Sequence, residues 1–201
     1  MLKLRKVAVT GGIASGKSTV TSFFRKFGAY VVSADQIVHQ LLLSHTALIN
    51  QVVSLLGDQI LQNGCIDRKM MAEAVFKSPE LLHKLEAILH PMVAAEITRQ
   101  WNEARSTECP LFVAEVPLLF EAGQDSWYDV TIAVVCPEKV CKERFADYER
   151  RATLQWTQAQ KAKKAKFIIE NTGSLEELEA KCAALYTLLS TGEDLDDESR
   201  K

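Results

Sequence analysis

The sequence has no long apolar run and no strong excess of charge of either sign. Its longest apolar runs, such as 116–120, are far shorter than the ~20 residues that a membrane helix needs. The 24 basic and 26 acidic side chains give a net charge of −2, so no global field favours DNA, RNA or a lipid surface as the main partner. We therefore expect neither a nucleic-acid partner nor a membrane partner.

The sequence also lacks a paired cysteine motif. Its five cysteines are widely spaced, no C-x-x-C pair occurs, and Cys136 and Cys141 have no neighbouring histidines of the kind found in zinc sites. Scattered thiols are typical of proteins in a reducing compartment, so the expected location is the cytoplasm.

What is present is an alternation of strands and helices, which predicts an α/β fold with a parallel sheet covered on both faces. Short apolar runs predict five strands, at residues 5–10, 29–33, 110–116, 129–135 and 166–170. Apolar residues at helical spacing from Val20 to Phe27 predict a helix after the first strand, and Ser174 begins a capping box for the last helix.

Residues from about 36 to 105 show no convincing strand pattern and predict a helical insertion between two strands. Asp67 and Ser78 are expected helix caps, and Pro91 is the expected start of a further helix. Residues 138 to about 164 are polar and predicted to be helical.

These patterns predict a single unit over residues 1–190. Its core is expected at 1–35, 106–138 and 166–190, with the insertion at 36–105 and a lid at 139–165. Residues 191–201 are expected to form a flexible acidic tail.

Residues 11–18 (GGIASGKS) match the phosphate-loop pattern G-x-x-x-x-G-K-[ST] completely. Gly11 and Gly16 let the backbone turn and approach an anion, and the helix that begins near Lys17 adds its positive end. Lys17 supplies an ammonium group for the β- and γ-phosphates, and Ser18 supplies a hydroxyl for Mg²⁺. The predicted strand before the loop and helix after it are the context that the motif requires, so we expect a nucleoside triphosphate site.

A phosphate loop alone does not choose among enzymes. The sequence has no Asn-Lys-x-Asp segment, which disfavours a GTPase, and it is too short for most motor ATPases. The remaining interpretation is a kinase that closes a lid over ATP and a small acceptor.

Asp35 follows the second predicted strand, at the edge of the sheet where ligands bind in doubly wound folds. A carboxylate there can accept the proton of an attacking hydroxyl, although helix capping before Gln36 is an equally good interpretation. Residues 139–166 contain nine basic and three acidic side chains. Their arginines are expected to fold onto the phosphates, although a solvated helix face remains an alternative.

Several other polar residues are candidates for the acceptor side. His90 precedes Pro91 and is expected between two helices of the insertion. A lone histidine there is more often structural than functional. Glu115 and Glu121 bracket the end of the third strand, where either could hold a metal-bound water or an acceptor hydroxyl. Arg68 follows a helix cap, where an anionic acceptor could lie.

The motifs together resemble the dephospho-coenzyme A kinase family. The matching segments occur in the family's order from about Val7 to Leu178, nearly the whole chain. They are TGGIASGKST (10–19), SAD (33–35), IDR (66–68), VF (75–76), LHP (89–91), VPLLFE (116–121) and KFIIENTG (166–173).

The resemblance implies an adenylate-kinase-like, three-layer α/β/α P-loop kinase with a five-stranded parallel sheet, a helical acceptor domain and a lid. It implies transfer of the γ-phosphate of ATP to the 3′-hydroxyl of the ribose of dephospho-coenzyme A, with Mg²⁺ as cofactor and ATP and dephospho-coenzyme A as partners. We expect a monomer or a small homo-oligomer.

The resemblance also assigns roles to residues of this sequence. Asp35 becomes the preferred general base, acting with Lys17 and the lid arginines Arg144 and Arg151, and Gln155 and Lys161 match nearby lid positions. Acceptor binding is expected from Asp35, Arg68, His90 and Glu121, and metal binding from Ser18. The expected ATP site comprises Gly12, Ile13, Ala14, Ser15, Gly16, Lys17, Ser18, Thr19, Asn171 and Gly173.

Three departures from the family pattern stand out. Ser33 replaces a usual aspartate, which leaves Asp35 as the carboxylate of its segment. Cys141 replaces a usual glutamine, and the lid between Arg144 and Arg151 is several residues shorter than is typical.

Two rival functions remain open from the residues themselves. One is another P-loop kinase, acting on a nucleoside monophosphate or a sugar acid. The other is a nucleotide-dependent binding module that hydrolyses ATP slowly or not at all. Stimulation of ATP consumption by an acceptor would separate them.

Overall fold

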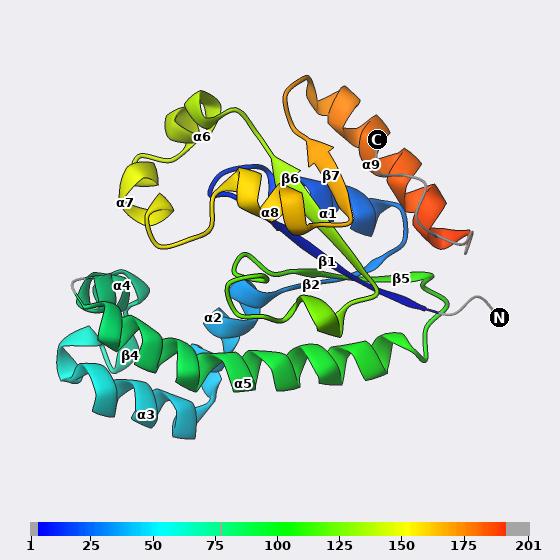
Figure 1. The fold of residues 1–201 in the computed structure, drawn as a ribbon. Coiled ribbons are helices and arrows are strands. Elements are labelled where there is room, and N and C mark those ends of the chain that lie inside the picture. The colour runs from blue at the N-terminus through cyan, green and yellow to red at the C-terminus, as the bar shows by residue number, and fades with distance from the viewer. Residues whose placement is uncertain (1–3, 77, 192–201) are drawn as a thin grey trace. The chain divides into compact units, whose positions relative to one another are not determined.

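A five-stranded parallel sheet organises the computed structural model, which describes residues 4–76 and 78–191 (Figure 1). The sheet order is β2-β5-β1-β6-β7, so β1 lies at its centre. Each strand end lies within one residue of its predicted position. The strands are β1 (Arg5–Gly11), β2 (Tyr30–Ser33), β5 (Leu111–Glu115), β6 (Val130–Val135) and β7 (Phe167–Glu170).

Helices α1 (Lys17–Lys26) and α9 (Leu175–Ser190) cover one face of this sheet. Val7 and Val9 of β1 are fully buried beneath them, together with Val20 and Phe24 of α1. Alternate residues of a strand point to one face, which is why the odd-numbered valines of β1 share this core. Burying each such side chain contributes ~1.5–3 kcal/mol, so this layer is a major source of stability.

The opposite face is covered by α8 and by the end of α5. Helix α8 (Gln158–Lys164) packs on β6 and β1. Trp101, near the end of α5, places its ring edge against Phe112 of β5, with 5.3 Å between ring centroids and 82° between planes. The fold is therefore a three-layer α/β/α sandwich.

The chain divides into two compact units, which we call the core unit and the helical unit. The core unit comprises Met1–Ser33 and Trp101–Lys201, and the helical unit Ala34–Gln100. The helical unit contains α2 (Ala34–Ser44), α3 (Thr46–Leu56), α4 (Arg68–Phe76), most of α5 (Pro79–Ala104) and the 3₁₀ turn η1 (Asp58–Ile60).

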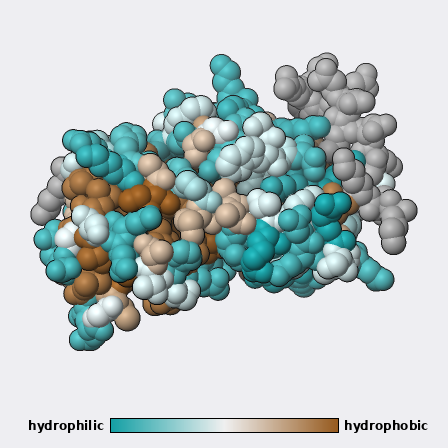
Figure 2. All heavy atoms as spheres, turned by 90° about the horizontal axis from the view of Figure 1, so that it is seen from below, coloured by the Kyte–Doolittle hydropathy of each residue, from teal (hydrophilic) through white to brown (hydrophobic). Residues whose placement is uncertain are grey.

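The helical unit has its own hydrophobic core, which includes Leu48, Val52 and Ile60. Figure 2 shows that hydrophobic residues also gather on the visible surface of this unit. The predicted boundaries of insertion, lid and tail stay predictions. Apart from Thr191, the acidic tail expected at 191–201 lies outside the described residues.

The expectation of an entirely helical insertion was wrong at one hairpin. Strands β3 (Leu61–Gln62) and β4 (Cys65–Ile66) pair antiparallel across Asn63 and Gly64. Both turn residues have positive φ, 52° and 78°, as a type I′ turn requires. Asn-Gly is the strongest short-range signal for this turn, so the sequence contained the information.

The expectation that Pro91 begins a new helix was also wrong, because Pro91 lies inside α5. His90 is therefore not between two helices. A proline inside a helix removes one backbone hydrogen bond and costs ~3 kcal/mol. Leu85, Leu89 and Ile97 of the same helix are buried on both sides of Pro91, and their packing offsets that cost.

The predicted helix caps at Asp67 and Ser78 are confirmed. Asp67 Oδ1 accepts hydrogen bonds from the backbone N–H groups of Lys69 and Met70, at 2.8 and 2.9 Å. Ser78 Oγ accepts from the N–H of Leu81 at 3.3 Å. The alternative interpretation of Asp35 as the cap of a helix beginning at Gln36 was wrong, however. Helix α2 already begins at Ala34 and includes Asp35 in its first turn.

The polar stretch from residue 138 is helical as expected, but it breaks into three helices. They are α6 (Glu138–Arg144), α7 (Tyr148–Ala152) and α8. Phe145 has an extended backbone and ends α6. Thr157 starts α8 with a capping box in which Gln160 is the reciprocal partner. The 3₁₀ turn η2 (Asp125–Trp127) precedes β6.

Candidate active site

The phosphate loop joins β1 to α1, in the strand-loop-helix context that the motif predicts. Gly16 has a φ of +99° and caps α1, a conformation that favours glycine. A Cβ at Gly16 would also clash with the side-chain amide of Asn171. At the other end of the loop, a Cβ at Gly11 would clash with the carbonyl oxygen of Val134. Both glycines are therefore needed for close backbone packing as well as for turning.

The Lys17 ammonium lies over the loop. Its Nζ donates to the carbonyl oxygens of Gly12, at 2.8 Å, and Gly11, at 3.4 Å. The charge is thereby held at the amino-terminal end of α1, where the helix dipole also favours anions. This places a cation and a fixed dipole in one candidate anion site.

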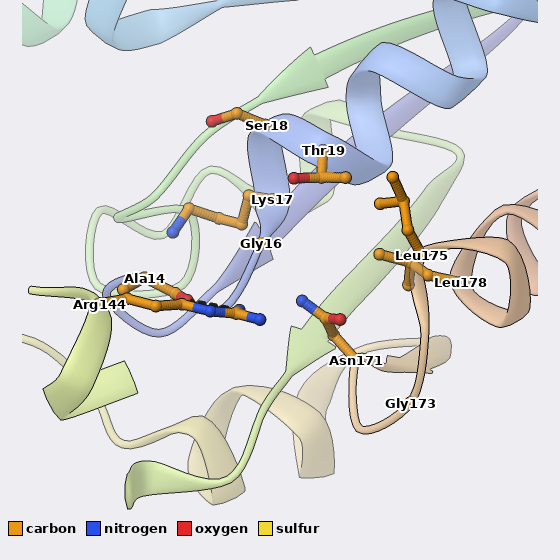
Figure 3. A pocket seen from close by; sticks show the side chains of 10 residues that line it. All are labelled: Ala14, Gly16, Lys17, Ser18, Thr19, Arg144, Asn171, Gly173, Leu175 and Leu178. Carbon is orange, nitrogen blue, oxygen red and sulfur yellow. Dashed lines mark hydrogen bonds between the residues drawn. The ribbon is translucent and has the colours of Figure 1, made fainter. Parts of the chain in front are cut away.

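Two more segments of the core unit contact the loop. Asn171, just after β7, donates its side-chain N–H to the Ser15 carbonyl oxygen at 2.9 Å, while its backbone N–H bonds to Val135. From α6, Arg144 donates to the Ala14 carbonyl oxygen at 3.4 Å. Figure 3 shows Arg144 and Asn171 entering from opposite sides of the loop.

These contacts border a cavity of about 460 Å³. The volume and the mixed polar and apolar lining suit a small-molecule ligand. The lining includes seven of the residues predicted for ATP binding and the predicted lid residue Arg144. The full set is Ala14, Gly16, Lys17, Ser18, Thr19, Arg144, Asn171, Gly173, Leu175 and Leu178 (Figure 3).

Gly12 and Ile13, the first variable positions of the loop, line a different cavity of about 300 Å³. Lid residues, including Tyr148, Trp156 and Gln158, complete its wall. Ser15, between Ala14 and Gly16, lines neither of these two cavities and is fully buried. The loop therefore has one cavity on the side of α1 and another on the side of the lid.

Glu115 is a site residue that sequence reasoning left as one of two possibilities. It ends β5, is only 7% exposed, and accepts hydrogen bonds from Ser18 Oγ at 3.0 Å and Thr21 Oγ1 at 3.2 Å. A buried carboxylate beside a hydroxyl offers the oxygen ligands that Mg²⁺ prefers. Its place at the end of the strand next to the loop was the signal that could have selected it.

Within the described ranges 4–76 and 78–191, no group of three or more His, Cys, Asp or Glu side chains is arranged to hold a metal ion. Mg²⁺ sites in phosphoryl-transfer proteins typically use one or two protein oxygens and complete the shell with phosphates and water. The pair of Ser18 and Glu115 fits that pattern.

Glu121 lies in a buried ion pair. Its Oε1 accepts from Lys161 Nζ at 2.9 Å and from the backbone N–H of Trp156 at 2.9 Å. Lys161 is completely buried, and this burial lowers its pKa, while Glu121 opposes the shift. The acceptor-binding role predicted for Glu121 stays a prediction.

The remaining predicted residues are not among those that line the nucleotide cavity. Asp35 is exposed in the first turn of α2, Arg68 is exposed at the start of α4, and His90 is half-buried in α5, all in the helical unit. Arg151 belongs to the core unit but stacks over Phe145 at 5.2 Å and does not line the cavity of Figure 3.

Within the part of the chain that the structure describes, no helix has the length and hydrophobicity that crossing a membrane requires.

Comparison with protein families matches residues 5–177 to the model described as dephospho-CoA kinase. A dephospho-CoA kinase of Protochlamydia amoebophila is 41% identical over 196 residues, covering 92% of this chain and 97% of that protein. One from Chlamydia pneumoniae is 40% identical, with 94% and 98% covered.

Solved structures agree with these matches. TT1252 from Thermus thermophilus superposes with a TM-score of 0.77 at 31% identity, covering 92% of this chain and 98% of that one. The dephospho-CoA kinase from Campylobacter jejuni gives 0.69 at 27% identity, covering 94% and 98%. A shikimate kinase from Aquifex aeolicus, with a TM-score of 0.54 at 15% identity and 93% and 99% coverage, shares the fold.

Proposed function

Because the chain belongs to the dephospho-CoA kinase family, we propose that its phosphate loop and Asp35 together transfer the γ-phosphate of ATP to the 3′-hydroxyl of the ribose of dephospho-coenzyme A. The chain is thus an ATP-dependent kinase of coenzyme A biosynthesis. The observation that supports the chemistry best is the cavity of Figure 3, where Lys17, Arg144 and Asn171 surround the amino-terminal end of α1.

ATP binding is assigned to the loop and its neighbours. The backbone N–H groups of residues 12–19 and the Lys17 ammonium bind the phosphates, and residues 171–173 lie beside the adenine. Phosphoryl transfer has a loose transition state with charge on the equatorial oxygens, so fixed donors stabilise it more than proton abstraction does.

Ser18 and Glu115 are the residues assigned to Mg²⁺. When bound, the ion would neutralise charge on the phosphates during transfer. The Ser18 hydroxyl would hold the ion, and the Glu115 carboxylate, which accepts a hydrogen bond from that hydroxyl, would orient it.

Asp35 is assigned as the general base. Ser33 pairs with Glu115 in the sheet register. Two peptide units then separate Ser33 from Asp35, so the covalent chain keeps the Asp35 Cα within ~7.6 Å of the Ser33 Cα. Asp35 accepts the proton of the 3′-hydroxyl while the oxygen bonds to the γ-phosphorus and the bond to the leaving ADP breaks.

Arg144 and Arg151 are assigned to the charge clamp of the lid, and Arg68, His90 and Glu121 to the acceptor. Arg144 already lies at the loop through its hydrogen bond to Ala14, whereas Arg151 must leave Phe145 to reach a phosphate. Lid closure also excludes water, which would otherwise compete as nucleophile. We further propose a cytoplasmic location and a monomer or small homo-oligomer.

An acceptor assay tests this function. ATP consumption is measured with Mg²⁺ and with dephospho-coenzyme A, coenzyme A, AMP or shikimate, and the product is identified by mass. We expect strong stimulation by dephospho-coenzyme A and one added phosphoryl group. Coenzyme A is the matched control, since its 3′-position is already phosphorylated. Equal stimulation by coenzyme A or AMP would refute the proposed acceptor.

A further inference from the structure

Lys161 is completely buried, although it belongs to the most basic segment of the sequence. Its neighbours in α8, Lys163 and Lys164, are exposed. Lysine is almost never fully buried unless it is paired, because removing an ammonium group from water is costly. The burial of Lys161 therefore needs partners that compensate for the lost hydration of its ammonium group.

Those contacts converge on the turn that follows β5. Lys161 Nζ donates to the Pro117 carbonyl oxygen at 2.5 Å and lies 2.9 Å from Glu121 Oε1. The same Glu121 oxygen accepts the backbone N–H of Trp156, just before α8. Both ends of the turn from Pro117 to Glu121 are thus held by one stretch of the lid segment.

The Pro117 carbonyl oxygen also accepts a hydrogen bond from Thr10 Oγ1 at 3.0 Å. Thr10 is the residue before Gly11, where the phosphate loop begins. Pro117 lies two residues after Glu115, whose carboxylate accepts hydrogen bonds from the hydroxyl groups of Ser18 and Thr21. One carbonyl group therefore joins Lys161 to the end of β1, next to the groups assigned to phosphate and metal.

A second residue of α8 repeats this arrangement at β6. Gln158 accepts from the Cys136 N–H at 2.8 Å and donates to the Cys136 carbonyl oxygen at 3.1 Å. Its side chain lies directly beside Gly12, since a Cβ on Gly12 would overlap it. The first turn of α8 is consequently hydrogen-bonded to residues that follow β5 and β6, and it packs against Gly12, which follows β1.

We propose that Lys161 is a positioning residue for phosphoryl transfer, which holds the ends of β1 and β5 in register through Pro117 and Glu121 and so aligns the phosphate loop with the turn at 117–121. It acts through these groups and does not touch ATP. The inference rests on the proposed function, because alignment matters only if the loop transfers phosphate. Small misplacements at a reacting centre can cost ~10²-fold in rate, so the loss of this link should appear in kcat.

The test compares kcat and KM of Lys161→Met with those of the wild type, normalised to folded enzyme. Methionine keeps the length and removes the ammonium. We expect kcat to fall at least ~10-fold and the KM for ATP to stay within ~3-fold, because Lys17, Arg144 and Asn171 lie outside this network. A kcat within threefold of the wild type would overturn the proposal, as would an effect confined to the KM for ATP.

Loss of stability is separated from loss of alignment by two further variants. Leu189→Ala opens a cavity in the core at the far end of α9 and should lower Tm without lowering kcat per folded molecule. The double variant Lys161→Met with Glu121→Leu leaves no unpaired buried charge, so its Tm should rise above that of Lys161→Met while kcat at saturating dephospho-coenzyme A stays at least ~10-fold low. Loss of the acceptor contact assigned to Glu121 would appear in the KM for dephospho-coenzyme A instead. Recovery of kcat together with Tm, or an equal kcat loss in Leu189→Ala, would show a merely structural role.

Lys163→Met is the matched control within α8. Lys163 is exposed and forms no hydrogen bond or ion pair in the described residues, so its variant should behave as the wild type. Failure of the proposed function would be visible separately, as a wild-type protein that transfers no phosphate to dephospho-coenzyme A.

Discussion

The phosphate loop at residues 11–18 and the predicted lid at residues 139–165 both lie in the core unit, yet their contacts are built by different means. The loop acts through its backbone: glycines, carbonyl groups and the start of α1 are fixed by a sequence motif. The predicted lid depends on side chains instead, and its eight lysines and arginines differ in whether they are buried, paired or exposed. Lys161 is buried, Lys142 is paired with two glutamates, and Arg144 reaches the loop.

This difference shows that the number of charged side chains in a segment does not determine what each of them contacts. The pKa of Lys142 is raised, chiefly by its hydrogen bond to Glu138 and then by that to Glu149, so this lysine is strongly held as a cation by acidic neighbours. Such exposed pairs contribute little to stability, because solvent screens them. The lid's effect on catalysis should therefore depend on a few members, which substitution can identify.

The largest expected effect is in the loop. Lys17→Ala removes the cation assigned to the β- and γ-phosphates and should lower kcat by ~10²–10⁴-fold, at least as much as Asp35→Asn. Positioning and charge stabilisation outweigh proton abstraction in a loose transition state, which sets this order. Steady-state kinetics with saturating ATP measure both variants. Lys26→Ala, at the exposed end of the same helix, is the control, and near-normal turnover by Asp35→Asn would remove Asp35 from the mechanism.

The next effect separates two lid arginines. Arg144→Ala should lower kcat by ~10²-fold, because Arg144 borders the nucleotide cavity and donates to Ala14. Arg151→Ala should cost less, ~10-fold, because Arg151 is stacked on Phe145 and would reach phosphate only after the proposed lid closure. Parallel kcat and KM measurements decide the order. A larger loss from Arg151 would mean that closure, not the present contact, selects the catalytic arginine.

How far sequence could predict this molecule differs between the same two regions. The five strands, the loop and the start of α1 follow from short apolar runs and glycines, since local backbone requirements dictate them. The burial of Lys161 could not be predicted, because four lysines in six residues read as a solvated surface. Only the tertiary packing of α8 on β1 and β6 distinguishes it.

The helical unit shows the same limit. Asp67 and Ser78 were predictable as caps because a cap acts within one helical turn. The continuity of α5 through Pro91 was not, because packing on both sides of the proline overrides the local preference. The Asn63-Gly64 hairpin had a readable local signal, and the surrounding helical pattern obscured it.

A smaller effect is expected from a substitution that tests whether ATP binding depends on the backbone conformation of the phosphate loop. Gly16→Ala places a Cβ against the Asn171 amide at a φ of +99°, and the strain of ~1–3 kcal/mol should raise the KM for ATP roughly tenfold or more. Gly123→Ala is the matched control, since φ there is +63° and a Cβ would meet nothing within 4 Å. It should share the conformational cost and leave the KM unchanged. Equal effects of both substitutions on KM would show that the loop tolerates the added side chain.

The smallest expected effect concerns stability next to the nucleotide cavity. Ser174 Oγ accepts from the Glu177 N–H at 3.3 Å, and Glu177 Oε2 accepts from the Ser174 N–H at 3.2 Å, which closes the capping box of α9. Ser174→Ala should lower the free energy of unfolding by ~1 kcal/mol, and so Tm by ~2–4 °C for a chain of this size. Ser190→Ala, at the other end of α9, loses only a bond to the Tyr186 carbonyl oxygen and should change Tm by less. A calorimetric scan of both variants compares them directly. If the two substitutions lower Tm equally, the capping box adds no stability beyond that of a single hydrogen bond. Helix α9 is then held by the packing of Leu178, Cys182 and Leu189 on the sheet.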